Sequence, residues 1–257
     1  MTAVDAEAWP RPPMGVDRWG TPEGEWLRPL TSLQTMRWPP PPATGSPEPR
    51  LVVVAPHPDD EALGVGGLMV RCIGQGWTVL VVAVSDGEAA FGRARPRLAR
   101  RRRREQDSCL ARLTAGGPGV LTTVRLELPD GAITAHEHEL EGQLTSVLRP
   151  GDWCLTTCAW DGHPDHEATG RAAAAAAHAA GAVVAEYPVW AWHWATASSF
   201  PWHRARRIDL SAREQRVKVA AVAEHRSQLA PTWRRPSPVV PPHVLIRFHR
   251  LCEVVFP

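Results

Sequence analysis

The chain has 257 residues, enough for one large domain or two small ones with a buried core. Hydrophobic residues make up 44% of it and charged residues 22%, a balance that excludes a disordered or fibrous protein. Its 29 Lys and Arg residues nearly balance its 27 Asp and Glu residues, so no strong net charge points to nucleic acid or an anionic membrane as a partner.

Two further features bear on the cellular location. The first thirty residues lack the basic and apolar segments of a secretory signal, and no window reaches the roughly 18 apolar residues of a membrane span. The five cysteines are an odd number in a chain too long to need disulfide staples. We therefore expect a cytoplasmic protein without a disulfide framework, and the sequence leaves its oligomeric state open.

Residues 1–50 form the first segment, which is rich in Pro and Trp and shows no helical or strand periodicity over a useful length. We interpret it as an N-terminal arm and residues 51–257 as a single domain. Tryptophan rings are costly to leave in water. We therefore expect some of the arm's four tryptophans to pack onto that domain: Trp9, Trp19, Trp26 and Trp38.

From residue 51 onward, short apolar runs alternate with longer helical patterns, which is typical of βαβ units. The expected fold is an α/β, Rossmann-like open sheet, mostly parallel, with helices on both faces. The expected strands are 51–55, 78–84, 120–126, 153–158 and 182–186, with one or two closing strands within 244–256. The expected helices are 61–74, 96–113, 137–148, 164–180 and 211–229.

A polar cluster comes directly after the first of these strands. The strand at 51–55 leads into Pro56-His57-Pro58-Asp59-Asp60-Glu61, and a helix begins there. In open α/β sheets, ligands bind at the carboxyl ends of the strands. Asp59 and Asp60 are neighbours and cannot point the same way, so one carboxylate can bind a metal while the other accepts a proton.

The strand at 153–158 is followed by a similar cluster, His163-Pro164-Asp165-His166, which opens an Ala-rich helix. Pro164 suits the first helical position and places His166 in the first turn. His57, Asp60 and His166 would then supply two imidazoles and one carboxylate. That is the ligand set of a catalytic zinc site with water in the fourth position.

Simpler interpretations exist for single residues. Asp59 or Asp165 alone could cap a helix, but two such clusters, each after a buried strand and before a helix, are hard to explain by capping. Gly64, Gly66 and Gly67 lie inside the expected helix, where they favour close packing on the sheet over a dinucleotide loop. The arginines at 100–104 spread around a helix and indicate a solvated surface rather than a nucleic-acid site.

These motifs resemble those of the LmbE-like, or PIG-L, family of metal-dependent N-deacetylases. The resemblance spans about residues 51–230 and rests mainly on the two histidine motifs. The main departures are Ser85, where Thr is commoner, and the N-terminal arm. Supporting segments are 85–88, Arg102 with Glu105 and Gln106, 128–131, 186–194 and 218–228.

The resemblance implies removal of an N-acetyl or other N-acyl group from an amino sugar or glycoside. It implies that His57, Asp60 and His166 bind zinc and that Asp59 is the general base. It also implies that His163, oriented by Asp165, stabilises the oxyanion or protonates the leaving amine. A cationic His163 would complement the charge of the tetrahedral intermediate.

Three further residues are candidate substrate contacts: Arg102, Asp130 and Trp192. Core packing is an equally good interpretation of the tryptophan. One divalent metal per chain is expected, with zinc best suited to the ligands, although iron or cobalt would fit almost as well.

Two alternative functions stay open. The first is a metal-dependent phosphoesterase, which usually shows a second ligand set for a second metal. The second is an inactive sugar-binding module, which would need neither Asp59 nor His163.

Overall fold

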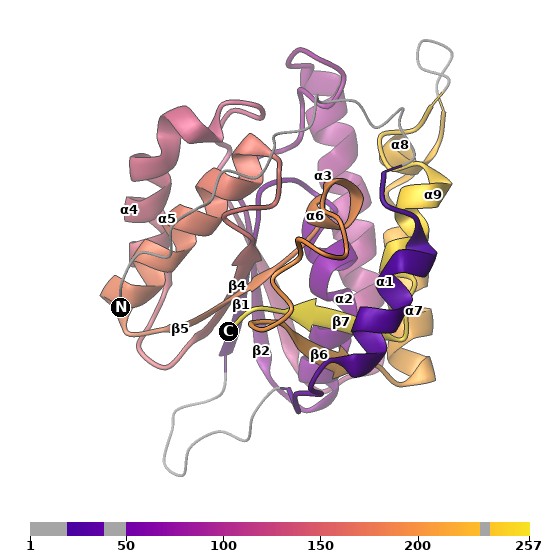
Figure 1. Cartoon of the computed structure of the whole chain (residues 1–257). Coiled ribbons are helices and arrows are strands. Elements are labelled where there is room, and N and C mark those ends of the chain that lie inside the picture. The colour runs from indigo at the N-terminus through magenta and orange to yellow at the C-terminus, as the bar shows by residue number, and fades with distance from the viewer. Residues whose placement is uncertain (1–19, 39–49, 232–236) are drawn as a thin grey trace.

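The computed structural model describes residues 20–38, 50–231 and 237–257. Its centre is a five-stranded sheet with the strand order β3-β2-β1-β4-β5, in which every pair is parallel (Figure 1). The predicted α/β fold with a parallel sheet is therefore confirmed. The strands are β1 (Arg50–Ala55), β2 (Thr78–Ala83), β3 (Val120–Arg125), β4 (Trp153–Thr157) and β5 (Val183–Tyr187).

Alternate residues of the central strands serve two separate cores. In β1, Leu51 and Val53 join the core on one face, whereas Val52 and Val54 join the core on the other. Figure 1 shows α4 and α5 covering one face, and α2, α3 and α7 the opposite one. These helices are α2 (Asp60–Gly74), α3 (Pro96–Thr114), α4 (Glu137–Val147), α5 (Pro164–Ala180) and α7 (Ala212–Val222), with a short 3-10 turn, η1 (Ile133–His136), before α4.

Two expectations are wrong: one concerns the burial of β3, and the other the length of the helix expected at 211–229. The outermost strand β3 is not covered on both faces: its residues alternate in exposure, with Val120 56% exposed, whereas Leu121 on the other face packs against the core. The helix expected at 211–229 ends at Val222, and a separate turn, α8 (Arg226–Leu229), comes after it.

One closing strand lies in the C-terminal region, as expected, and it belongs to a small second sheet. β6 (Arg206–Asp209) pairs with β7 (Cys252–Val255) in antiparallel register, and Phe256 bridges to Glu186 at the edge of the large sheet. The first part of the region expected to hold closing strands, up to Phe248, is instead helical, as α9 (Pro242–Leu245) and η2 (Ile246–Phe248). Pro242 at the first helical position, where its missing N–H costs nothing, accounts for the start of α9.

The glycines of α2 permit the close packing expected from the sequence. A Cβ at Gly64 would overlap the ring of Tyr187 on β5. The helix is irregular at Val65. The amides of Gly67 and Leu68 donate to the buried carboxylate of Glu253, with donor–acceptor distances of 2.8 Å in both cases. Lys218 of α7 neutralises that carboxylate at 2.7 Å, which fixes the helix that carries Asp60.

Part of the Pro- and Trp-rich segment is ordered, and two of its tryptophans pack onto the domain as expected. It contains α1 (Glu23–Ser32), whose apolar stripe is limited to Trp26 and Leu30, one turn apart. Trp26 is fully buried against Trp192 and Phe200, with ring centroids 5.1 and 5.3 Å away, and Trp38 is also buried. Trp9 and Trp19 lie outside the described residues.

Membrane insertion through a helix finds no support in the described ranges. None of their helices combines the length and the apolar character needed to span a bilayer.

The burial of Trp26 gives a test of how strongly α1 is held. We expect Trp26→Ala to lower the free energy of unfolding by about 3–5 kcal/mol, because it removes a fully buried indole and leaves a cavity. Leu27→Ala is the matched control: Leu27 is 52% exposed, so its change should stay within about 0.5 kcal/mol. Urea denaturation of both variants measures the difference, and equal stabilities would contradict the packing described here.

Candidate functional site

The site lies where the strand order reverses. β1 and β4 are neighbours, with Val54 opposite Thr156, although almost a hundred residues separate them in sequence. The chain leaves β1 for α2 on one face and leaves β4 for α5 on the other, so a crevice opens between their carboxyl ends. Both histidine motifs come directly after these two strands, which brings them into one crevice.

Three donor atoms meet in this crevice. His57 Nδ1 lies 3.2 Å from Asp60 Oδ2 and 3.2 Å from His166 Nε2, and these two partners are 3.3 Å apart. Zinc bonds of about 2.0–2.1 Å in tetrahedral geometry require donor atoms about 3.3 Å apart. The triangle therefore fits a metal of this size, and burial of all three residues shields it from bulk water.

Carboxylates behind the histidines set their tautomers. His166 Nδ1 lies 2.8 Å from Asp161 Oδ2, and His57 Nε2 lies 3.1 Å from Asp130 Oδ1 and 3.2 Å from Asp165 Oδ2. A ring nitrogen that faces a carboxylate carries the proton, so the opposite nitrogen can present its lone pair to a metal. The ligand atoms are thus directed toward one another by the groups behind them.

The ionisation of the cluster without metal results from the same contacts. Burial opposes the charge of His166, but the Asp60 and Asp161 carboxylates outweigh it and raise the pKa of His166 to about 9. For His57, burial is likewise outweighed by hydrogen bonds with Asp130, Asp165 and Asp60, and its pKa is raised well above the usual value. Despite burial, the charge of His166 holds the pKa of Asp60 well below its usual range.

Asp59 has a different environment from its neighbour Asp60. Its backbone adopts φ of +142°, which is strained for a residue with a side chain. Burial raises the pKa of Asp59 to about 7, against the opposing charge of Arg102, whose Nη2 lies 3.0 Å from Asp59 Oδ1. Two adjacent carboxyl groups are therefore separated in pKa, as acid–base chemistry requires.

Two of the expected substrate-contact residues, Arg102 and Asp130, form hydrogen bonds with other residues of the protein. Arg102 is 3% exposed and donates to the carbonyls of Pro58 and Gly87 as well as to Asp59. Asp130 accepts from His57 and from the amide of Ala89. Both residues line the cleft, so contact with substrate stays a prediction, but Arg102 contacts Asp59 and Asp130 contacts His57.

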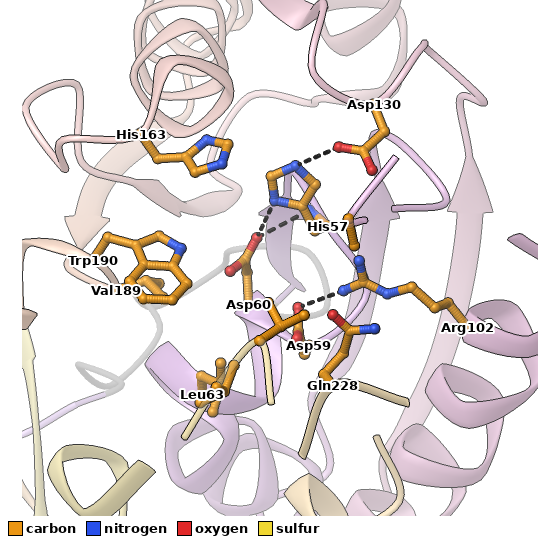
Figure 2. A pocket seen from close by; sticks show the side chains of 13 residues that line it. His57, Asp59, Asp60, Leu63, Arg102, Asp130, His163, Val189, Trp190 and Gln228 are labelled. Carbon is orange, nitrogen blue, oxygen red and sulfur yellow. Dashed lines mark hydrogen bonds and ion pairs between the residues drawn. The ribbon is translucent and has the colours of Figure 1, made fainter. Parts of the chain in front are cut away.

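The third expected substrate contact, Trp192, is wrong in position. Its ring is buried in an aromatic cluster, stacked on Phe200 with centroids 4.7 Å apart, because α6 (Ala191–Trp194) turns that side chain toward α1. Trp190, which immediately precedes α6, lines the cleft instead, and Figure 2 shows it opposite Asp60. The sequence Trp-Ala-Trp-His-Trp could not tell which ring faces the cleft.

His163 lies at the cleft beside His57, with ring centroids 5.1 Å apart. As the N-cap of α5, its Nδ1 accepts from the amide of Asp165 at 3.3 Å, which leaves Nε2 to carry the proton. Burial, together with the positive charges of His166 and His57, lowers the pKa of His163 to about 3. This environment contradicts the expected cationic His163 and favours a neutral ring that donates from Nε2.

Asp165 does not orient His163 through its carboxylate in the expected way. The carboxylate accepts from the amides of Gly131 and Ile133 and faces His57 Nε2, while its backbone N–H contacts His163. The reason is its place in the first turn of α5, where the side chain reaches back over the loop at 130–133. Asp165 therefore supports His57, a candidate metal ligand, directly.

The cleft around these groups has an empty volume of about 530 Å³, part of it open to solvent. Its lining combines charged and polar side chains with apolar ones. In Figure 2, Trp190 and His163 lie on one side of His57 and Asp60, and Arg102 and Gln228 on the other. The apolar lining residues are Leu63, Ala90, Val189, Trp190, Val239 and Val240.

Sequence reasoning missed Asp161. It is fully buried two residues before His163 and contacts His166. Its place between a strand end and a predicted metal motif was a signal, but any loop carboxylate has the same signal. Glu61 was also missed: burial raises its pKa to about 7, and Gln106 donates to it at 3.0 Å.

Comparison with known proteins points to one family. The family model described as PIG-L, GlcNAc-PI de-N-acetylase, matches residues 52–177, which include both histidine motifs. A 1D-myo-inositol 2-acetamido-2-deoxy-alpha-D-glucopyranoside deacetylase of Rhodococcus erythropolis is 27% identical over 222 residues, covering 74% of this chain and 69% of the relative.

Solved structures agree in fold. A conserved protein of Thermus thermophilus superposes with a TM-score of 0.53 at 26% identity, covering 70% of this chain and 79% of that one. A deacetylase of the teicoplanin biosynthesis pathway gives a TM-score of 0.54 at 25% identity, covering 70% of this chain and 85% of that one.

The protonated state of the metal-free histidines gives a test of the donor triangle. At pH 7 a His166 with a pKa of about 9 holds a proton on the nitrogen that a metal needs. Zinc binding should therefore release at least one proton per ion, and zinc affinity should rise with pH until about pH 9. Calorimetric titration in buffers of different ionisation enthalpy counts the protons, and zinc binding without proton release would contradict the described ionisation.

Proposed function

This chain belongs to the PIG-L family, and from that premise we propose that it is a zinc-dependent enzyme that removes an N-acetyl or other N-acyl group from an amino sugar or glycoconjugate. The observation that carries the proposal is the triangle of His57, Asp60 and His166 donors with a separate, ionisable Asp59 beside it. Metal ligands and a proton acceptor are the two parts that metal-assisted amide hydrolysis requires.

A bound metal would act through its positive charge. A divalent ion held by His57, Asp60 and His166 would polarise the amide carbonyl and make a water more acidic. Zinc suits two imidazoles and one carboxylate, and the three donor-to-donor distances agree with its tetrahedral preference.

Asp59 is proposed as the general base. With a pKa of about 7 its carboxylate is ionised in a large fraction of molecules at neutral pH, yet it is basic enough to take a proton from attacking water. Arg102 holds Oδ1 of this carboxylate, which leaves the other oxygen for the water. The same carboxyl group can then return the proton to the departing nitrogen as the C–N bond breaks, giving a free amine and a carboxylic acid that loses its proton to solvent at neutral pH.

His163 is proposed to donate a hydrogen bond to the oxygen of the tetrahedral intermediate. Its Nδ1 is occupied by the backbone amide of Asp165, so the proton on Nε2 is directed to the other side of the ring. A neutral donor of this kind stabilises the developing negative charge without transferring its proton. Trp190 and Val189 on the adjacent wall would contact the sugar or its acyl group.

No observation favours the alternative functions. Within residues 20–38, 50–231 and 237–257, the two groups of candidate metal ligands share His57, so they are not the independent sites of a two-metal phosphoesterase. A sugar-binding module would have no use for a buried, strained carboxylate beside the ligands.

Variants of Asp59 and His166 should distinguish a loss of catalytic rate from a loss of metal binding. We expect Asp59→Asn to retain about one zinc per chain and lose about 10²–10⁴-fold in kcat, the usual contribution of a general base. His166→Ala should lose both metal and activity, because it removes one corner of the triangle. Elemental analysis and steady-state rates measure the two effects, and an Asp59→Asn enzyme as active as the wild type would overturn the mechanism.

The activity itself is tested by release of acetate and free amine from a panel of N-acetylglucosamine derivatives. The panel should include glycosides with polar and apolar aglycones and with longer acyl chains, because the cleft lining includes both polar and apolar side chains. Chelator-sensitive acetate release that zinc, iron or cobalt restores would support the proposal and identify the preferred metal. A metal-loaded protein that releases phosphate from phosphate esters, and no carboxylate from amides, would refute it.

A further inference from the structure

Asp161 connects two parts of the site that the chain supplies from different segments. This carboxylate lies in the loop after β4 and is fully buried. Oδ2 faces His166 Nδ1 at 2.8 Å and accepts from the Trp190 amide at 2.8 Å. Oδ1 accepts from the amides of Val189 and Ala191, at 2.8 and 3.0 Å. One carboxylate thus holds a metal-ligand candidate and three consecutive amides of the cleft wall.

The buried carboxylate of Asp161 requires hydrogen-bond donors around it. A buried carboxylate is costly unless hydrogen bonds replace its water shell. Four N–H groups converge on Asp161, one from an imidazole and three from backbone. Any displacement of the wall therefore strains the contact with His166, and any change at His166 alters the acceptor on which the wall rests.

The wall is also held from its outer side. The amide of Thr21 donates to the carbonyl of His193 at 3.1 Å, and its hydroxyl donates to the carbonyl of Ala195 at 2.5 Å. These hydrogen bonds anchor the segment just after Ala191. The backbone positions of Val189 and Trp190 then depend on their hydrogen bonds to Asp161. Both of these residues line the cleft.

Resting on the proposed function, we propose that Asp161 is a positioning residue that couples His166 to the substrate wall formed by Val189 and Trp190. It fixes the His166 tautomer so that Nε2 can bind metal, and it fixes the wall against which the sugar or acyl group packs. Metal binding and substrate fit are then linked, and by reciprocity each strengthens the other.

Asp161→Asn is the direct test. The amide keeps one acceptor oxygen, but its NH₂ group faces His166 Nδ1 and the Trp190 amide, where acceptors are needed. We expect zinc affinity to fall 10–100-fold in chelator competition, the usual effect of losing a carboxylate behind a metal-binding histidine. With zinc saturating, KM should rise several-fold more than kcat falls.

Two controls isolate the coupling. Trp190→Ala leaves every amide bound to Asp161 in place, so it should raise KM without changing zinc affinity. Asp152 is a buried carboxylate just before β4 that binds Arg50 of β1, remote from the crevice, so Asp152→Asn should change neither quantity. Wild-type zinc affinity in Asp161→Asn would overturn the proposal, as would a fall in zinc affinity at unchanged KM.

A second measurement needs no Asp161 variant and no activity. In the wild-type protein, zinc should slow hydrogen exchange of the amides of Val189, Trp190 and Ala191 about tenfold, because zinc on Nε2 would anchor the His166 ring and with it the Asp161 carboxylate that accepts from these amides. The reference amides are those of β2, which should not respond. Unchanged exchange at 189–191 on zinc binding would refute the coupling, whereas slowed exchange without deacetylation would leave it standing and refute the proposed function alone.

Discussion

The parallel pairing of β1 with β4 is the constraint on which the whole site depends. Strands that are neighbours in the sheet, but that lead into helices on opposite faces, leave an opening at their carboxyl ends. The segments after these strands supply His57, Asp59 and Asp60 from one side and His163 and His166 from the other. Loss of this pairing would separate the donor triangle, because His57 and Asp60 come from the first motif and His166 from the second.

The buried charges of the crevice are tolerated because each has a partner. Asp59 is paired with Arg102, and His166 with Asp60 and Asp161. Removing one member of such a group leaves its partner buried and unpaired, which costs more than the interaction itself contributes. In metal-free protein the protons on the histidines compensate the carboxylates, and a divalent ion would take over that role.

The sequence was sufficient for the sheet and for the two motifs, and physical reasons explain why. Apolar runs buried on both faces are continuous enough to predict β1, β2 and β4, and parallel strands place the loops at their carboxyl ends along one edge of the sheet. The donor residues His57, Asp60 and His166 lie in or next to such loops. Their meeting therefore depends on strand order alone, not on side-chain details.

The remaining features depend on contacts between segments remote in sequence. The orientation of Trp190 toward the cleft, and of Trp192 toward the core, is decided by Trp26 and Phe200, which no local pattern connects to them. Helix α1 is stable through that same packing, because a ten-residue helix with Pro29 inside it has little stability of its own. Asp161 likewise acquires its partners only when the loop after β5 folds over it.

The most direct test of the account is the location of the metal. In crystals of zinc-loaded protein, an anomalous difference map recorded at the zinc absorption edge should show a single strong peak per chain. That peak should lie within ordinary zinc bond distances, about 2.0–2.2 Å, of His57 Nδ1, Asp60 Oδ2 and His166 Nε2. A peak bound elsewhere, or two peaks of equal strength in the crevice, would contradict the account of a single-metal site.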